Sequence, residues 1–266
     1  MSNPSVQLYS VRDAIDEDLD GAVARVAEIG FRQVEPYAFH LRTADYKRAF
    51  AATGVTAPSG HAPVIDSDEP AAILDAAAEL GMTTVIDPFI PTDRWQTSDD
   101  VHRIAERVNE LSELAKARGL EFGYHNHQWE FTNRVEGRVA YDLFVELLAP
   151  DVVLEVDTFW ATVGGADTPA VLRSLGDRVR ALHIKDGRIT GDIATVLPSS
   201  ESALVVPEAL KAAFENQTPA GQGDIDVLAI LQASPNALRV VEFDAYRGDV
   251  FEGIAESLAW LAQNDA

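Results

Sequence analysis

The sequence predicts a single (β/α)8 barrel over residues 1–266, and three observations lead to this fold. Short apolar runs alternate with longer segments of helical periodicity about eight times along the chain. The apolar runs are continuous, as is typical of parallel strands that are covered on both faces. The chain has 266 residues, a usual length for one barrel, and it contains no linker rich in Pro and Ser. A doubly wound sheet is the alternative, but it would need a glycine-rich turn after the first strand, which is missing.

This pattern places eight strands and the clearest of the intervening helices. The expected strands are Val6–Tyr9, Gln33–Glu35, Val55–Ser59, Thr84–Asp87, Leu120–His125, Val152–Asp157, Val179–Ile184 and Arg239–Phe243. The clearest amphipathic helices are Leu19–Ile29, Ala71–Leu80, Val101–Ala117 and Val139–Leu148. Gly30, Gly81 and Gly119 separate a helix from the next strand, where glycine commonly ends a helix.

One connection, at about residues 187–223 after the seventh strand, is much longer than the others. We expect a loop insertion there, with a short helix near Pro207–Phe214. Loops of this length within a compact domain are usually lids or binding loops, and this one follows a strand end. We interpret Gly221-Gln222-Gly223-Asp224 as a tight turn with a helix cap at Asp224; a phosphate-binding nest is the less common alternative.

Composition excludes several classes of protein. With 43 acidic and 21 basic side chains the formal net charge is -22, which disfavours nucleic acid as a partner. Adaptation to a salt-rich cytoplasm and GC-rich coding are two explanations that both stay open. The chain has no Cys, so disulfides, thiolate metal sites and a cysteine nucleophile are excluded. Without a leader pattern or a run of membrane-spanning length, we expect a cytoplasmic protein with no membrane partner.

Ionisable side chains gather where the predicted strands end. In a (β/α)8 barrel these ends build the active site. The residues there are Tyr9, Glu35, Tyr37, His61, Asp87, His125, His127, Glu155, Asp157, His183, Lys185, Glu242 and Asp244. Burying so many polar groups without a function would cost roughly several kcal/mol each. The sequence therefore predicts a functional site at this end of the barrel.

A subset from strands five to eight forms a candidate cage for one divalent ion. Its members are His125, Asp157, His183 and Glu242. Nitrogen and carboxylate ligands without sulfur suit Mn²⁺, Zn²⁺, Co²⁺, Fe²⁺ or Mg²⁺. Neighbours two residues away on the same strand face would orient these ligands or touch substrate: His127, Glu155, Lys185 and Asp244. For any single residue, a hydrogen-bonded pair inside the barrel is the alternative.

Motifs on these strands resemble the xylose isomerase-like barrel superfamily over essentially the whole chain. They are Gly30-Phe31-Arg32-Gln33-Val34-Glu35, Gly60-His61, Tyr124-His125-Asn126-His127, Leu154-Glu155-Val156-Asp157-Thr158-Phe159-Trp160, His183-Ile184-Lys185-Asp186 and Val241-Glu242-Phe243. The resemblance is to the branch of sugar phosphate isomerases/epimerases, which includes inosose dehydratases, ketose 3-epimerases and apurinic endonucleases.

This resemblance implies a divalent ion held by a Glu, an Asp, a His and a second Glu. The Asp matches Asp157, the His matches His183 and the last Glu matches Glu242, whereas the first Glu falls on His125. In the epimerases the two glutamates also shuttle the substrate proton, so here the second role passes to a neighbour, most simply His127 or Lys185. The Tyr-His-x-His form is similar to the inosose dehydratase side of the family.

The resemblance implies a metal-dependent sugar isomerase or epimerase that abstracts a proton next to a carbonyl; a keto-polyol dehydratase is the alternative. Glu242 is the first candidate base, with His125, His127 and Lys185 as further catalytic candidates. The expected substrate-binding residues are Glu35, His61, Trp160, Glu155 and Asp244. A non-catalytic sugar-binding barrel stays open, and the acidic charge disfavours an endonuclease-type phosphodiesterase. The expected partner is a small sugar or polyol, and homo-oligomerisation is left open.

Overall fold

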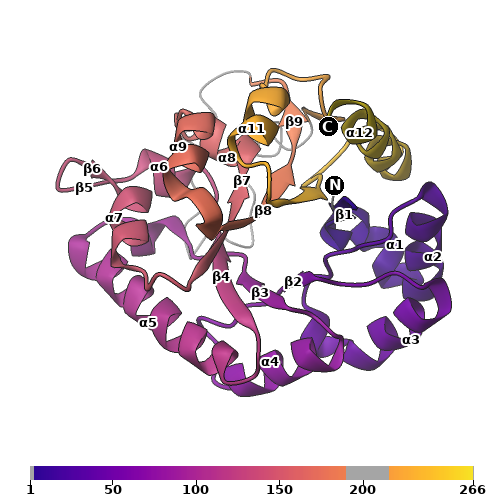
Figure 1. The fold of residues 1–266 in the computed structure, drawn as a ribbon, viewed down its shortest axis with the longest axis horizontal. Coiled ribbons are helices and arrows are strands. Elements are labelled where there is room, and N and C mark those ends of the chain that lie inside the picture. The colour runs from indigo at the N-terminus through magenta and orange to yellow at the C-terminus, as the bar shows by residue number, and fades with distance from the viewer. Residues whose placement is uncertain (1–2, 190–215, 266) are drawn as a thin grey trace.

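Parallel strands curl around a common axis inside a ring of helices in the computed structural model, which describes residues 3–189 and 216–265 (Figure 1). Seven strands form one sheet in the order β1-β11-β8-β7-β4-β3-β2, and every neighbouring pair is parallel. Their bounds are β1 Ser5–Val6, β2 Ser59–His61, β3 Thr84–Asp87, β4 Glu121–His125, β7 Val153–Asp157, β8 Val179–Ile184 and β11 Leu238–Val241.

The segment 33–37 fills the gap between β1 and β2. Isolated parallel bridges join Gln7 to Glu35, Gln33 to Thr56 and Tyr37 to His61. The Glu35 amide donates to the Val6 carbonyl at 2.8 Å, and the Leu8 amide donates to the Glu35 carbonyl at 2.8 Å. This segment therefore takes the place of the second strand, and the predicted TIM barrel is confirmed.

Helices cover the outside of the sheet (Figure 1). Their bounds are α1 Arg12–Glu17, α2 Leu19–Ile29, α3 Thr43–Thr53, α4 Pro70–Glu79, α5 Ser98–Lys116, α6 Trp129–Thr132, α7 Ala140–Leu147, α8 Thr158–Val163, α9 Thr168–Leu175, α11 Val227–Ala233 and α12 Val250–Asn264. Short 3-10 helices are η1 Leu8–Val11, η2 Phe39–Leu41, η3 Thr92–Trp95 and η4 Gly176–Arg178. Two further pairs of short antiparallel strands lie outside the main sheet: β5 Arg134–Val135 with β6 Arg138–Val139, and β9 Asp186–Gly187 with β10 Gln217–Thr218.

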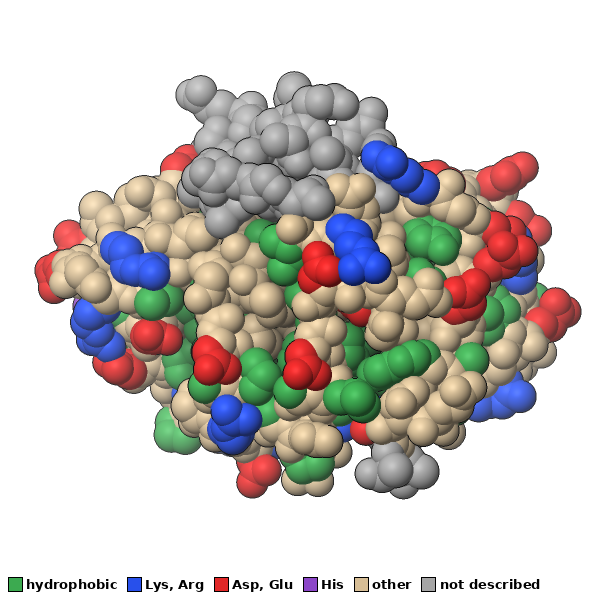
Figure 2. All heavy atoms as spheres, turned by 90° about the horizontal axis from the view of Figure 1, so that it is seen from above, with side chains coloured by type: hydrophobic (Ala, Val, Ile, Leu, Met, Phe, Trp, Pro, Cys, Tyr) green, Lys and Arg blue, Asp and Glu red, His purple; other side chains and the backbone are tan. Residues whose placement is uncertain are grey.

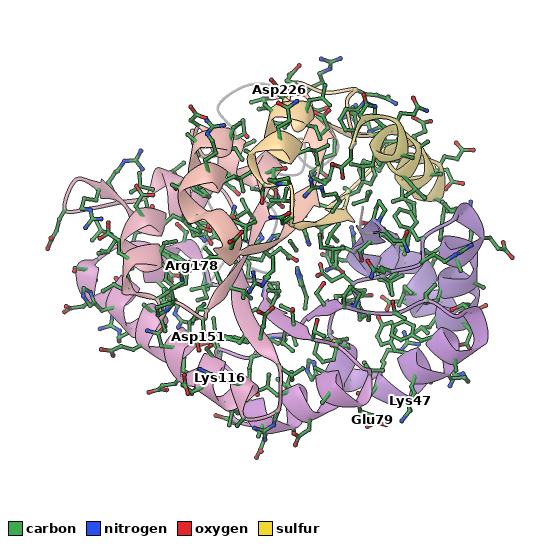
Figure 3. All side chains as sticks on the ribbon, in the orientation of Figure 1. Lys47, Glu79, Lys116, Asp151, Arg178 and Asp226 are labelled. Carbon is green, nitrogen blue, oxygen red and sulfur yellow. The ribbon has the colours of Figure 1, made fainter. Side chains whose placement is uncertain are left out.

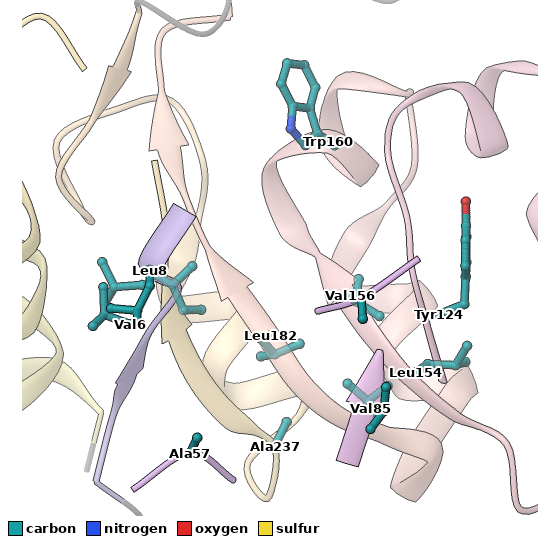
Figure 4. Packing of buried hydrophobic residues seen from close by; sticks show 14 of the residues in the cluster. Val6, Leu8, Ala57, Val85, Tyr124, Leu154, Val156, Trp160, Leu182 and Ala237 are labelled. Carbon is teal, nitrogen blue, oxygen red and sulfur yellow. The ribbon is translucent and has the colours of Figure 1, made fainter. Parts of the chain in front are cut away.

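Alternation along the strands separates the apolar core from the polar barrel axis. On β7, Leu154 and Val156 face the helices and pack with Val85, Leu182 and Tyr124 (Figure 4). Successive side chains on a strand point to opposite faces. The intervening residues of β7 therefore point into the barrel, where carboxylates and imidazoles gather.

Three predicted strands end at the wrong residue, and local chemistry explains two of the errors. The remaining error is at Arg239–Phe243, which runs two residues past the end of β11 at Val241. The first strand ends early because the Gln7 side chain accepts a hydrogen bond from the Tyr9 amide and begins η1. The third strand is displaced toward His61, since Pro58 has no amide hydrogen to donate to a neighbouring strand.

The structure describes the long connection after β8 up to residue 189 and again from residue 216. Pro207–Phe214, where a short helix was expected, lies outside the described residues. The predicted cap at Asp224 is also wrong, because the N-cap of α11 is Asp226, whose side chain accepts from the Ala229 amide. Asp224 instead accepts from Arg188 and from the Ile189 amide. Within the described residues, no helix combines the length and apolarity needed to cross a membrane.

Candidate metal centre

Four neighbouring strands bring the predicted ligands to one end of the barrel. His125 ends β4, Asp157 ends β7, and His183 lies near the end of β8. Asp157 is directly opposite His183 in the sheet, while Glu242 follows β11, whose Val240 is opposite His183. The strand register places only Asp157 and His183 directly opposite each other. His125 is opposite Glu155, two residues before Asp157, and Glu242 lies two residues beyond Val240, so the four side chains reach the same end of the barrel from different register positions.

Asp157, His183 and Glu242 form what we name the upper cluster. Their ligand atoms all lie within 4.8 Å of one another, and all three residues are buried. His183 Nδ1 is 2.5 Å from Glu242 Oε2. The Lys185 ammonium group lies between the carboxylates, 2.7 Å from Asp157 Oδ2 and 2.6 Å from Glu242 Oε2. This cluster thus holds two carboxylates, an imidazole and a resident cation.

A lower cluster shares His183 with the upper cluster and consists of His61, His125, Glu155 and His183; its Glu155 lies two residues before Asp157 on β7. The Glu155 Oε1 atom is 2.5 Å from His61 Nε2, 3.1 Å from His125 Nδ1 and 3.0 Å from His183 Nε2. One carboxylate oxygen therefore contacts three imidazoles, which holds all three rings in fixed orientations.

The contact with Glu155 determines which ring nitrogen of His125 is unprotonated. Because Nδ1 donates its hydrogen to the carboxylate, Nε2 carries the lone pair. That Nε2 atom lies 3.6 Å from Asp157 Oδ2 in the upper cluster. The geometry therefore brings His125 close to Asp157 and, in the lower cluster, to His183, with Glu155 as its positioning partner.

Burial and charge set the protonation of the upper cluster. Burial raises the pKa of Asp157 to about 6, although Lys185 opposes the shift. Burial would also raise the pKa of Glu242, but His183 and Lys185 lower it well below its usual value. Despite the burial of Lys185, three carboxylates hold the pKa of its ammonium group well above the usual value. Burial and the nearby His183 lower the pKa of His125 to about 3, which leaves a neutral imidazole.

The residues of the upper cluster fit a divalent ion. The buried Asp157 Oδ2 atom is paired with the Lys185 ammonium group at 2.7 Å, and His125 Nε2 lies 3.6 Å from it. Buried carboxylate oxygens beside imidazole nitrogens are suited to a metal ion. The ligand roles of His125, Asp157, His183 and Glu242 stay predictions, and the geometry is compatible with them.

His127 lies beside the clusters on the turn after β4. Its ring stacks on Trp129 with centroids 4.2 Å apart and lies 5.2 Å from the His125 ring. Burial, and then His125, lowers the pKa of His127 well below its usual value, so the imidazole is neutral. Its backbone amide donates to Glu130 Oε2 at 2.9 Å, and Glu130 Oε1 accepts from the Tyr124 hydroxyl at 2.7 Å.

Several residues predicted to bind substrate also have hydrogen-bond partners within the protein. Glu35 is fully buried, and its carboxylate accepts from Gln7, Ser59 and His183. Trp160 is also fully buried and donates from Nε1 to Asp244 Oδ2 at 3.1 Å. The substrate contacts of Glu35, His61, Glu155, Trp160 and Asp244 stay predictions.

Sequence reasoning missed the polar side chains that orient these groups. Gln217 holds Asp244 through Nε2 at 2.6 Å, while Gln7 and Ser59 hold Glu35. Glu130 and Tyr124 hold the turn of His127. For Glu130 a signal existed, since a Glu in the apolar run Trp129-Glu130-Phe131 is either exposed or buried with a partner.

Fold and site together define a TIM barrel with a buried cluster of metal-ligand side chains at the C-terminal ends of its strands. The model of the Xylose isomerase-like TIM barrel family matches residues 23–264. The chain belongs to this family.

Two of the matching sequence relatives are inosose dehydratases. The chain is 30% identical over 141 residues to an inosose dehydratase of Clostridium tetani, a match over 52% of this chain and 42% of that protein. It is 25% identical over 104 residues to an inosose dehydratase of Serratia proteamaculans, over 38% of this chain and 32% of that one. The matches thus span less than half the length of these relatives.

Solved structures share the fold. A sugar phosphate isomerase/epimerase from Parabacteroides distasonis has a TM-score of 0.75 at 20% identity, covering 100% of this chain and 95% of its own. The IOLI protein with a bound zinc atom has a TM-score of 0.70 at 16% identity, covering 99% and 96%. D-psicose 3-epimerase in the presence of D-fructose has a TM-score of 0.64 at 14% identity, covering 99% and 99%.

Proposed function

We propose that the protein is a divalent-metal-dependent isomerase or epimerase of a sugar, which removes a proton next to a carbonyl group. The observation that carries the proposal is the upper cluster, in which Asp157, His183 and Glu242 place ligand atoms within 4.8 Å of one another. The zinc atom bound by a structural neighbour supports it.

The ion would be held by His125, Asp157, His183 and Glu242. When bound, it would supply Lewis acidity toward the carbonyl oxygen and so stabilise the negative charge of an enediolate. The protein's own part is to fix the ligands: Glu155 orients His125, and Glu35 together with Glu155 orients His183.

Proton transfer falls to the groups around the cluster. Glu242 is ionised because His183 and Lys185 lower its pKa, so it can accept a proton. His127 is neutral and its Nδ1 atom has no hydrogen-bond partner in the described part of the chain, which leaves it available as the second proton carrier. Lys185 is charged and can donate to an oxygen on which negative charge develops.

Dehydration of a keto-polyol is the second candidate, and two observations favour it. The matched sequence relatives are inosose dehydratases. Moreover, His125 stands where the resemblance implies a first glutamate, so one carboxylate base remains beside the ammonium group of Lys185. A single base with a separate acid over a departing hydroxyl is what elimination requires.

The test is incubation of the metal-loaded full chain with inososes, ketohexoses and 3-keto-glycosides in D₂O. We expect deuterium at one carbon of the true substrate; an epimer or isomer identifies the first candidate, and loss of water identifies the second. Glu242→Gln should abolish exchange, and Asp157→Ala should lose the ion while keeping the circular dichroism of the barrel. Absence of exchange and of product with all three classes would contradict the proposal.

A further inference from the structure

The Lys185 ammonium group takes a position that a divalent ion at the upper cluster would also be drawn to. It lies 2.7 Å from Asp157 Oδ2 and 2.6 Å from Glu242 Oε2, and the side chain is 1% exposed. Asp157 Oδ2 is also the carboxylate atom that faces His125 Nε2, at 3.6 Å. An ammonium group this close to two buried carboxylates supplies much of the attraction that a metal ion would supply.

Asp244 gives the same ammonium group a second partner outside both clusters. Lys185 Nζ donates to both oxygens of Asp244 at 3.0 Å each. Asp244 is itself anchored, because its Oδ2 accepts from Gln217 at 2.6 Å and from Trp160 at 3.1 Å, and its amide donates to Gln217 at 2.8 Å. Lys185 can therefore leave Asp157 and Glu242 without losing every ionic partner.

We propose that Lys185 is a built-in competitor of the divalent ion, which neutralises Asp157 and Glu242 in the ion's absence and keeps Asp244 as its partner when the ion binds. The inference rests on the metal-dependent function proposed above and adds the control of ion affinity at that site. Two cations are drawn to the same carboxylates and repel each other at short range. The affinity for the ion is consequently lower than the ligands alone would provide. Asp244 limits this loss of affinity, because it remains an ionic partner of Lys185 when the ion is bound.

The test is calorimetric titration of the chelator-treated full chain with Mn²⁺. Lys185→Met should bind Mn²⁺ roughly tenfold or more tightly, since the competing charge is gone. Asp244→Asn should bind it more weakly, because Lys185 then has no ionic partner besides Asp157 and Glu242. The matched control is Lys47→Met, whose ammonium pairs with Glu79 at 2.9 Å on the outer surface (Figure 3), and its affinity should equal that of the wild type.

The outcomes separate this inference from the proposed function. If the wild type binds one ion and Lys185→Met binds it equally or more weakly, the inference is overturned and the metal-dependent function stands. If the wild type binds none and Lys185→Met binds one, competition is upheld and the metal-dependent function falls; if neither binds, both fall. Should Lys185→Met fail to fold without metal, Asp244→Asn decides: weaker binding supports the inference, and equal or tighter binding overturns it.

Discussion

Among the histidines of the two clusters and the adjoining turn, His127 is the one that does not contact Glu155, and we proposed it above as the second proton carrier. His61, His125 and His183 all contact Glu155, whereas the Nδ1 atom of His127 has no hydrogen-bond partner within the described residues. The ring is held by stacking on Trp129 and by its backbone, so removing the imidazole leaves the clusters in place.

We therefore expect His127→Ala to keep its metal while kcat falls about 10²–10⁴-fold, the usual cost of one acid or base group. Metal analysis and steady-state kinetics on the substrate identified by deuterium exchange measure the two effects. Normal turnover in this variant would show that His127 is structural.

The carboxyl group of Glu130 makes stability depend on pH. Burial raises its pKa to about 8, although hydrogen bonds from Tyr124 and the His127 amide favour the charged form. A raised pKa in the folded state means that the folded chain binds the proton more tightly than the unfolded chain. Its contribution to stability is thus full below 4.5, the ordinary pKa of a glutamate side chain, declines as the pH rises, and is lost above about 8.

Glu130→Gln is neutral at every pH and removes this dependence. The unfolding free energy of the variant minus that of the wild type should increase from pH 5 to pH 9 in urea denaturation. Glu113→Gln, on the exposed face of α5, controls for the loss of one carboxylate. A difference for Glu130→Gln that does not change with pH would contradict the raised pKa.

At the scale of single residues, the sequence predicted which side chains lie near one another, but not how far along the barrel axis each side chain lies. His125, Asp157, His183 and Glu242 were found because each stands near a strand end. Glu35 also stands at a predicted strand end, but its carboxylate pairs with the Nε2 atom of His183, while Glu242 pairs with the Nδ1 atom of the same ring. Depth depends on how neighbouring strands are staggered around the barrel, which no local pattern encodes. The ammonium of Lys185 between two carboxylates likewise depends on three separate strands.

At the scale of elements, the close approach of β4 and β7 depends on Gly123. A Cβ atom there would overlap the backbone carbonyl oxygen of Val153 on β7. The two strands are paired at this point, Gly123 opposite Val153, and His125 follows two residues later. A larger residue must therefore push the strands apart next to the metal centre.

Gly123→Ala should lose about 1–3 kcal/mol of stability, the usual range for overpacking, and should bind Mn²⁺ more weakly because His125 moves. Gly137→Ala is the control: its φ of 81° strains the new residue, but no atom lies within 4 Å of the added Cβ. It should lose about 1 kcal/mol and keep its Mn²⁺ affinity. Equal Mn²⁺ affinities in the two variants would refute the link between Gly123 and His125.

Strand bounds were predictable where the apolar run has clear ends. Thr84–Asp87 and Val179–Ile184 match β3 and β8, and the helix Leu19–Ile29 matches α2. Two of the errors arose where a side chain or a proline overrides propensity, at Gln7 and Pro58. Gln33–Glu35 was expected as a strand and contributes isolated bridges, because the pairing of this segment alternates between two neighbours.

At the scale of the whole molecule, the acidic charge is only partly compensated. Surface ion pairs link neighbouring helices, such as Arg48 with Asp20 and Lys47 with Glu79, and Figure 2 shows carboxylates and cations interspersed on one face. Exposed pairs of this kind stabilise by about 0–1 kcal/mol each, whereas the net charge of -22 repels itself.

Salt should therefore stabilise this protein. Screening shortens the range of charge repulsion to about 3 Å at 1 M ionic strength, so Tm and activity should rise from dilute buffer to molar KCl. Differential scanning calorimetry and activity assays across KCl concentrations measure this. A Tm that is unchanged or lower in KCl, with full activity in dilute buffer, would remove adaptation to salt as the explanation of the acidic surface.

Closure of the ring has a consequence for how the chain is made. β1 pairs with β11 through Ser5 opposite Val240 and Val6 opposite Val241, residues more than two hundred positions apart in sequence. A nascent chain on the ribosome cannot form this seam until β11 has emerged, although most of the sheet is already synthesised. Until then β1 and β8 lack their partner, and unpaired strand edges promote association between chains. Slow synthesis or truncation ahead of β11 should thus yield aggregates, and co-translational binding of a chaperone would have most effect before this last pairing.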